Sequence, residues 1–142
     1  MITVRAAVGE DVDAVWPLAR DLATSYAVDH EAYARDFVTL VADPTVVLLV
    51  ATDDGVVVGY LLGQRHVTFH AGGPVIWVEE LMVAETRRGA GVGRALMRVV
   101  EERGRASGAA YLALATRRAA GFYAALGYEE SAAYLKKALG TP

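Results

Sequence analysis

The residues that most clearly suggest chemistry form a run of alternating glycines flanked by arginines: Arg88, Gly89, Ala90, Gly91, Val92, Gly93 and Arg94. The run follows an apolar segment and opens a segment with apolar residues at helical spacing, so it reads as a turn between a strand and a helix. The first N–H groups of a helix have no partner within it, and the helix dipole adds partial positive charge there. Glycines let a phosphate approach those groups without a Cβ in the way. The run therefore predicts an anion site.

Two well-known phosphate loops agree less well with this run. A Walker loop needs Lys followed by Ser or Thr, whereas Arg94 and Ala95 stand at those positions, so the hydroxyl that holds magnesium is missing. A dinucleotide loop needs the spacing Gly-x-Gly-x-x-Gly and an acidic residue at the end of the next strand, and residues 111–115 contain none. A small nucleotide-binding domain stays as a weaker alternative.

The surrounding pattern predicts the elements that position this loop in one domain over residues 1–142. Alternating or β-rich segments predict strands over residues 2–6, 46–52, 56–65, 75–83, 111–115 and 128–139. Helical spacing predicts a helix that begins at Gly9 or Asp11, and further helices over residues 30–41, 92–107 and 119–126. The order β-α-α-β-β-β-α-β-α-β indicates an α/β domain with a mixed sheet. The strands at residues 75–83 and 111–115 should be parallel neighbours.

Two segments resemble motifs of the GNAT superfamily of N-acetyltransferases. Residues 79–96 look like its motif A, the pattern R/Q-x-x-G-x-G/A after a strand, with Arg88, Gly91 and Gly93 at the defining positions. Residues 119–128 are similar to the family's A-x-x-F-Y-x-x-x-G-F/Y segment, at the expected distance. The resemblance is tight over residues 74–128. It implies a single-domain GNAT-like fold whose mixed central β-sheet carries helices on both faces.

The resemblance implies acetyl-CoA as co-substrate and no metal ion. In that family the motif A loop holds the pyrophosphate, and the pantetheine arm lies between two splayed parallel strands. The residues expected to contact the cofactor are Leu81, Met82, Val83, Arg88, Gly89, Ala90, Gly91, Val92, Gly93, Arg94 and Thr116. Thr116 stands where the family often has asparagine, so a hydroxyl would replace that amide contact. His66 and His70 lie near a strand end and are a weak metal signal.

Acetyl transfer to an amine needs a neutral nitrogen, whereas an alkylammonium group has a pKa of about 10 and is mostly charged at pH 7. A positioned carboxylate can take that proton. Glu79 and Glu80 interrupt an apolar strand, and adjacent strand residues point to opposite faces, so only one should face the acceptor. The family position that most often does so matches Glu79, the expected base. Glu80 is the alternative, because a bulge would reverse the parity.

The proton donor and the acceptor contacts also follow from the resemblance. Tyr123 matches the family tyrosine beside the coenzyme sulfur, so we expect it to protonate the leaving thiolate. Tyr26, His30 and Glu31 fall between the first two helices, in the segment that usually covers the acceptor site. They are expected to contact a small-molecule or protein amine. A non-catalytic CoA-binding sensor or interaction module of the same fold is the alternative function.

Composition excludes several other classes. The 142 residues carry a net charge of −3 and no cysteine, which argues against a general nucleic-acid surface and excludes disulfides and a Cys nucleophile. No apolar run approaches the roughly 20 residues of a membrane helix, and the first residues lack a secretory pattern. We therefore expect a cytoplasmic enzyme without a membrane partner. Many relatives pair through their C-terminal strands, so a homodimer is expected from the resemblance.

Overall fold

The computed structural model describes residues 1–24 and 27–140. The elements in chain order are β1 (Ile2–Ala6), η1 (Gly9–Asp11), α1 (Val12–Leu22), α2 (His30–Ala42), β2 (Val46–Asp53), β3 (Val56–Thr68), β4 (Gly73–Val83), η2 (Glu85–Arg87), α3 (Val92–Ala106), β5 (Leu112–Leu114) and α4 (Ala120–Ala125). The order predicted as far as the helix over residues 119–126 is confirmed. Within these described ranges, every helix is too short or too polar to cross a membrane.

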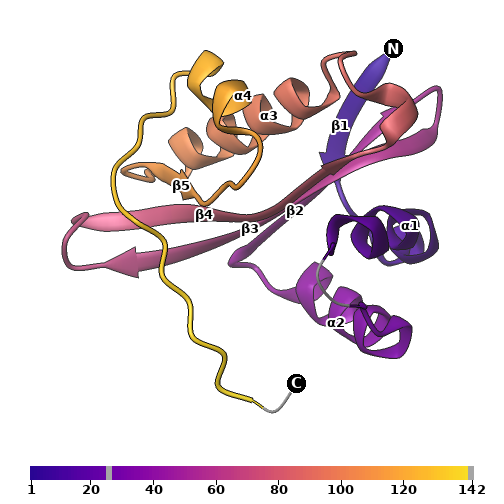
Figure 1. Cartoon of the computed structure of the whole chain (residues 1–142), viewed down its shortest axis with the longest axis horizontal. Helices are drawn as coiled ribbons and strands as arrows, with labels where there is room; N and C mark the ends of the chain where they lie inside the picture. The colour runs from indigo at the N-terminus through magenta and orange to yellow at the C-terminus, as the bar shows by residue number, and fades with distance from the viewer. Residues whose placement is uncertain (25–26, 141–142) are drawn as a thin grey trace.

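The five strands form one mixed sheet in the order β1-β2-β3-β4-β5 (Figure 1). Strands β1 to β4 pair antiparallel with their neighbours, whereas β4 and β5 are parallel because the chain crosses over through α3 between them. Asp54 and Gly55, with φ of 49° and 81°, form the turn of the β2–β3 hairpin. The Asp-Asp-Gly sequence at this position predicts such a turn.

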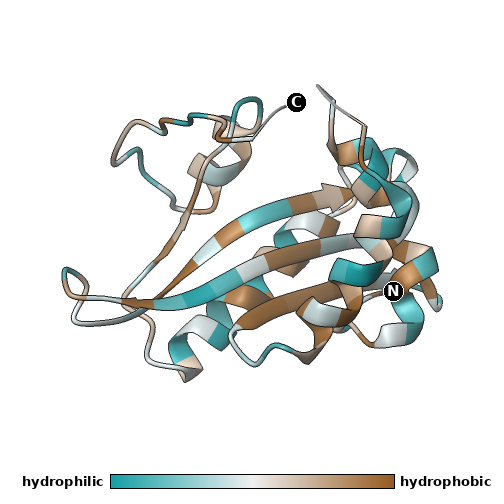
Figure 2. Cartoon of the chain, turned by 90° about the horizontal axis from the view of Figure 1, so that it is seen from below, coloured by the Kyte–Doolittle hydropathy of each residue, from teal (hydrophilic) through white to brown (hydrophobic). Residues whose placement is uncertain are grey.

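Helices cover both faces of this sheet (Figure 1). Helices α1 and α2 pack on one face, around a core that includes Val15, Phe37 and Tyr60. Helix α3 packs on the other face, where the core includes Leu96 and Met97 of α3 and Tyr123 of α4. Figure 2 shows apolar residues concentrated along the strands and hydrophilic residues recurring on the helices. Because the sheet separates the two cores, the core that a residue joins identifies the face of its side chain.

The parallel pairing of β4 with β5 is short. Cα partners join Ile76 to Leu112, Trp77 to Ala113 and Val78 to Leu114. Beyond this point β4 continues to Val83, whereas the chain after Leu114 leaves the sheet for α4. Among the described residues, positions 80–83 of β4 therefore pair with β3 alone, and the two parallel strands splay apart.

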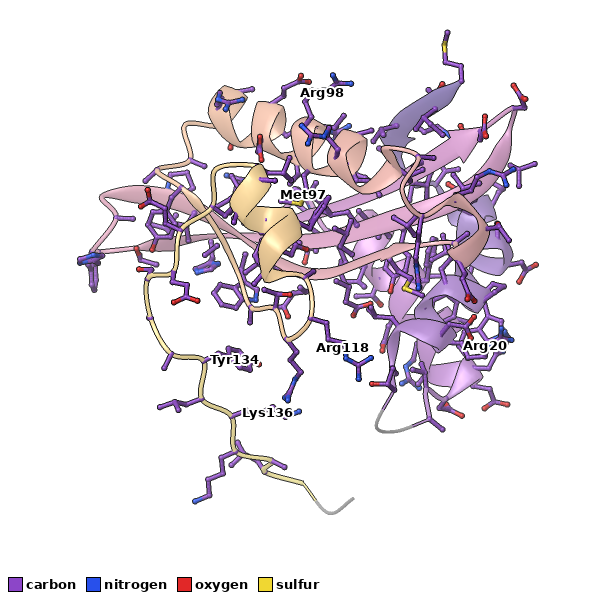
Figure 3. The ribbon with its side chains drawn as sticks, turned by 45° about the horizontal axis from the view of Figure 1, so that its top comes forward. Arg20, Met97, Arg98, Arg118, Tyr134 and Lys136 are labelled. Atoms are coloured by element: carbon purple, nitrogen blue, oxygen red, sulfur yellow. The ribbon has the colours of Figure 1, made fainter. Side chains whose placement is uncertain are left out.

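The last expected strand is not formed, and this prediction was wrong. Residues 128–139 contain no strand, and the segment passes as an irregular trace in front of β4 and β3 toward the C-terminus (Figure 1). All residues from 129 to 140 are exposed. Strand β5 is three residues long and offers few backbone groups for pairing. Alanine and lysine, both weak strand formers, are frequent in the segment. Its Tyr134, labelled in Figure 3, stacks on Trp77 of β4, with ring centroids 6.4 Å apart.

Candidate functional site

Two glycines with left-handed backbone shape the loop between β4 and α3. Gly89 and Gly91 have φ of 80° and 88°, a region that other residues rarely adopt. A Cβ built on either would meet no heavy atom within 4 Å, so conformation rather than crowding requires glycine here. Gly91 is the N-cap of α3 and has no side chain with which to cap the helix. The first N–H groups of α3 are therefore available to an anion.

Gly93 acts at the contact between two helices. A Cβ on Gly93 would lie 3.2 Å from Cζ of Phe122, closer than such contacts normally are. The missing side chain lets α3 and α4 approach each other at this point. The glycine loop is thereby joined to the helix that carries Tyr123.

The arginines around the loop differ in what they contact. The Nε of Arg87 bonds Asp53 at 3.3 Å, so this guanidinium is already paired. Arg88 is exposed, and its Nε donates to the carbonyl of Val83 at 3.4 Å. Arg94 is exposed in the first turn of α3, and Figure 3 shows Arg98 on the outer side of this helix. Arg88 and Arg94 are the loop arginines whose charge a carboxylate does not neutralise within the described residues.

A β-bulge in β4 places the two candidate carboxylates in different surroundings. Leu62 of β3 lies opposite Glu80 and Gly63 opposite Val78, so Glu79 is the extra residue without a Cα partner. Val78 belongs to the α3 core and Leu81 packs against it. The bulge thus reverses the expected alternation and brings Glu80 to the α1/α2 face. Glu79 is exposed, whereas Glu80 is half-buried.

The structure adds a tyrosine that sequence analysis missed. The O–H of Tyr60 donates to Oε1 of Glu80 at 2.7 Å. Tyr60 is 2% exposed and belongs to the α1/α2 core. A tyrosine in the centre of an apolar strand is the one sequence feature that could have drawn attention to Tyr60. Its partner could not be predicted, because the partner depends on the register between β3 and β4.

Tyr33 of α2 packs against the α1/α2 core, on the same face of the sheet as Glu80. The O–H of Tyr33 donates to the carbonyl of Val12 at 2.7 Å. Burial, and after it the negative charges of Asp13 and Glu80, raise the pKa of Tyr33.

The expected acceptor residues are only partly brought together. His30 begins α2 and packs edge-on against Trp16 of α1, with ring centroids 4.6 Å apart, and Trp16 also contacts Tyr33 at 5.1 Å. Glu31 is exposed in the first turn of α2. Tyr26 lies outside the described residues. The aromatic cluster of Trp16, His30 and Tyr33 therefore joins α1 to α2 on the same side of the sheet as Glu80.

Tyr123 combines a buried ring with an accessible hydroxyl. The residue is 9% exposed and packs edge-on against Phe122 and Tyr128. Its hydroxyl has no hydrogen-bond partner in the described part of the chain. Every fully buried polar side-chain atom in that part has a partner, so the unpartnered hydroxyl of Tyr123 must be accessible to solvent. Burial raises the pKa of Tyr123, which keeps its proton in place at neutral pH.

Thr116, the remaining expected cofactor contact, closes the turn before α4. Its Oγ accepts a hydrogen bond from the N–H of Ala119 at 3.0 Å and keeps its own proton for donation. Among the described residues, no group of three or more His, Cys, Asp or Glu side chains could hold a metal ion.

A second tyrosine–glutamate pair lies on the opposite face of the sheet. The O–H of Tyr128 donates to Oε2 of Glu101 on α3 at 2.7 Å, the same length as in the Tyr60–Glu80 pair. Burial, followed by the bond to Glu101, raises the pKa of Tyr128, and the charge of Arg105 opposes these effects. This pair therefore has a cation in its surroundings.

A glycine loop that opens a helix beside splayed parallel strands is typical of α/β transferases that use acyl-CoA. Comparison with known proteins agrees: residues 12–128 match the Acetyltransferase (GNAT) family. The chain therefore belongs to the GNAT family, as its two motifs predicted, and is an acetyl-CoA-dependent N-acetyltransferase.

Individual relatives support this assignment. An aminoalkylphosphonate N-acetyltransferase of Salmonella typhimurium is 31% identical over 140 residues, which cover 96% of this chain and 90% of the relative. An integron cassette protein from the mobile metagenome of Cole Harbour Salt Marsh has 27% identity and a TM-score of 0.88, over 98% of this chain and 91% of its own. An aminoglycoside N-acetyltransferase in complex with CoA shares the fold at 20% identity and a TM-score of 0.86, over 98% and 95% of the two chains.

Proposed function

We propose that the protein acetylates a primary amine of a small molecule or protein by direct attack of the amine nitrogen on the thioester of acetyl-CoA. The observation that carries this proposal is that two features of β4 are adjacent: the end of its pairing with β5 and the bulge. The strand parts from β5 after Val78, and the next residue is the bulged Glu79. The backbone that would bind the donor and the carboxylate that would accept a proton therefore meet at one point of the sheet.

The residues around the loop have the properties that a pyrophosphate requires. The N–H groups from Gly91 to Gly93 begin α3, and Gly89 and Gly91 present no Cβ to the ligand. Arg88 and Arg94 supply positive charge. We assign the backbone of residues 81–83 to the pantetheine arm, because it has no strand partner on the β5 side within the described chain. The hydroxyl of Thr116 is assigned a further donor contact.

Two side chains move protons in the proposed reaction. Glu79 takes a proton from the ammonium group, directly or through water, and the neutral nitrogen then attacks the carbonyl carbon. The C–N bond forms, the C–S bond breaks, and Tyr123 gives its proton to the sulfur of the leaving thiolate. The nitrogen loses its second proton as the amide forms, and this proton returns through water to the Tyr123 oxygen. The products are the N-acetyl compound and CoA. Exposure of Glu79 favours it because an incoming amine can reach the carboxylate, and Glu80 remains the alternative base.

The name of the Salmonella relative suggests the first acceptors to test, since an aminoalkylphosphonate joins a primary amine to an anionic group. The panel would also include polyamines, aminoglycosides and amino acids. Full-length protein is mixed with saturating acetyl-CoA and each amine, thiol release is followed with a chromogenic disulfide, and the product is checked by mass spectrometry. We expect CoA release that depends on at least one amine. Tight binding of acetyl-CoA by calorimetry, without turnover of any amine, would instead indicate the CoA-binding sensor.

A further inference from the structure

We propose that Glu79 and Glu80 have separate tasks: Glu80, positioned by Tyr60, binds the ammonium group of the acceptor, and Glu79 is left to take the proton. Tyr60 is thus a positioning residue for the acceptor, and Glu80 is the group that recognises the positive charge. This inference rests on the proposed function and specifies how its acceptor is held.

The first argument is the geometry of the hydrogen bond. Tyr60 is 2% exposed on a central strand, so its hydroxyl is a rigid donor, and the 2.7 Å bond to Oε1 restricts Glu80 to one orientation. Within the described residues no donor forms a hydrogen bond with Oε2 of Glu80. Every fully buried polar side-chain atom among them does have a partner. Oε2 therefore reaches solvent and can accept a hydrogen bond from a ligand.

The second argument is charge. The carboxylates that form ion pairs in the described chain are Asp11, Asp21, Asp36, Asp53 and Asp54. Glu80 is half-buried and has no basic side chain paired with it among these residues. A partly buried carboxylate that no cation pairs with favours binding of one at its accessible oxygen. An alkylammonium group supplies this charge, together with N–H donors for the carboxylate oxygen.

The third argument is the contrast with Glu79. Glu79 is the extra residue of the bulge, it is exposed, and no side chain holds it within the described part of the chain. A general base must reach the ammonium proton and then move away in its protonated form. An unrestrained side chain can do this more easily than a restrained one. A binding group benefits from restraint because less conformational entropy is lost when the ligand arrives.

The Tyr128–Glu101 pair provides a matched control. It has the same residue types and the same 2.7 Å bond, but it joins the segment after α4 to α3 on the opposite face of the sheet. Tyr128 packs against Tyr123, but Tyr128→Phe keeps that ring contact and removes only the hydroxyl. Loss of the Tyr128 hydroxyl therefore tests the general effect of breaking such a bond, without any change on the α1/α2 face.

The experiment compares the wild type with Tyr60→Phe, Glu80→Gln, the double variant and Tyr128→Phe, using the acceptor that the wild type acetylates best. We expect Tyr60→Phe to raise the KM for the amine roughly tenfold and Glu80→Gln to raise it roughly 10- to 100-fold, with kcat changed much less. In the double variant the KM should equal that of Glu80→Gln, because Tyr60 acts through Glu80. The KM for acetyl-CoA should stay unchanged throughout, and Tyr128→Phe should alter neither KM.

Three results would overturn the inference. One is a Tyr60→Phe effect that persists in full beside Glu80→Gln. Another is a fall in kcat at constant KM in Glu80→Gln, which would make Glu80 the base. The third is an unchanged KM in Tyr60→Phe with only a lower melting temperature, which would make the bond structural. Failure of the proposed function is a different result, namely no CoA release by the wild type. In that event, calorimetric titration of the CoA-loaded variants with propylamine still tests the binding group.

Discussion

The loop at the start of α3 and the α1/α2 face of β4 present different kinds of atoms to a ligand. The loop offers backbone N–H groups, and its glycines matter because two of them need φ of 80° and 88°. The face of β4 offers side chains from α2, β3 and β4, among them Tyr33, Tyr60 and Glu80. One site depends on backbone shape within a few residues of chain. The other depends on contacts between elements that are distant in sequence.

This difference explains why a GNAT enzyme can be assigned a donor more readily than an acceptor. In the proposed function, backbone groups bind the pyrophosphate that every acetyl-CoA molecule carries. The amine is bound instead by side chains that can be exchanged without disturbing the loop. If the comparison is right, substitutions in the two regions should affect different kinetic constants, and a substitution outside both should affect neither.

The largest effect is expected for Glu79→Gln, which removes the proposed base and keeps the size of the side chain. We expect kcat to fall by about 10³-fold, because general base catalysis typically contributes roughly 10²–10⁴-fold. The KM for acetyl-CoA should be unchanged, since the glycine loop is untouched. Steady-state assays would be compared with Glu102→Gln, an exposed glutamate of α3. Wild-type kcat in Glu79→Gln would remove Glu79 from the mechanism and direct attention to Glu80.

Tyr123→Phe should have the next largest effect, because it removes the proposed proton donor, which α4 carries beside the start of α3. Loss of the proton donor should lower kcat by about 10²-fold. Burial raises the pKa of Tyr123 above its usual value of about 10, so the active, protonated form persists at neutral pH and is lost as the pH rises through the raised pKa. The wild type should therefore keep its kcat up to about pH 10 and decline above it. The variant should lack this alkaline decline, and the same decline in both would exclude the assignment.

A moderate effect confined to the donor is expected for Gly91→Ala. Alanine at φ of 88° costs about 1–2 kcal/mol, so the loop should relax away from the shape that aims its N–H groups. We expect the KM for acetyl-CoA to rise about tenfold while the KM for the amine stays constant. Gly9→Ala is the control, because its Cβ would also meet nothing within 4 Å and its φ is not positive. Equal changes in both KM values would contradict the separation of the two regions.

The same separation describes what could be predicted from the sequence. The glycine loop, its strand and its helix were predicted because each signal is local: a turn at Gly89 and Gly91, and apolar residues at helical spacing after it. The parallel β4–β5 pair was predicted from the crossover between its strands. The position at which the two strands splay apart could not be predicted, because it depends on where β5 ends.

Contacts between distant elements were not predictable. The bulge that turns Glu80 toward Tyr60 depends on a register shift between Leu62 and Gly63, which no pattern within β4 reveals. The expected strand over residues 128–139 failed for a related reason. A strand needs an edge to pair with, and β5 provides only three residues. Gly93 shows the same limit, since its contact with Phe122 depends on how α3 and α4 pack.

The smallest effect on catalysis is expected for Asp11→Asn, which lies outside both regions. Arg5 bonds both carboxylate oxygens of Asp11, at 2.8 and 2.9 Å, and the N–H of Val8 bonds one of them at 2.8 Å. An asparagine amide would face one of these donors with its own N–H groups. Since Asp11 is 7% exposed, we expect a loss of about 1–3 kcal/mol in the free energy of unfolding, measured with urea. Neither KM should change at a temperature where both proteins are folded.

The pH dependence of that loss tests its cause. Hydrogen bonds from Arg5 outweigh the opposing effect of burial and, with the bond from Val8, hold the pKa of Asp11 below its usual value. A lowered carboxyl pKa stabilises the fold fully above the unfolded value of about 3.9, and this contribution is lost as the pH falls through the folded value. The difference between wild type and Asp11→Asn should therefore be constant from about pH 8 to pH 5 and shrink below about pH 4. A difference that stayed constant into acid would mean that the shape of the side chain, rather than its charge, stabilises the corner between β1 and α1.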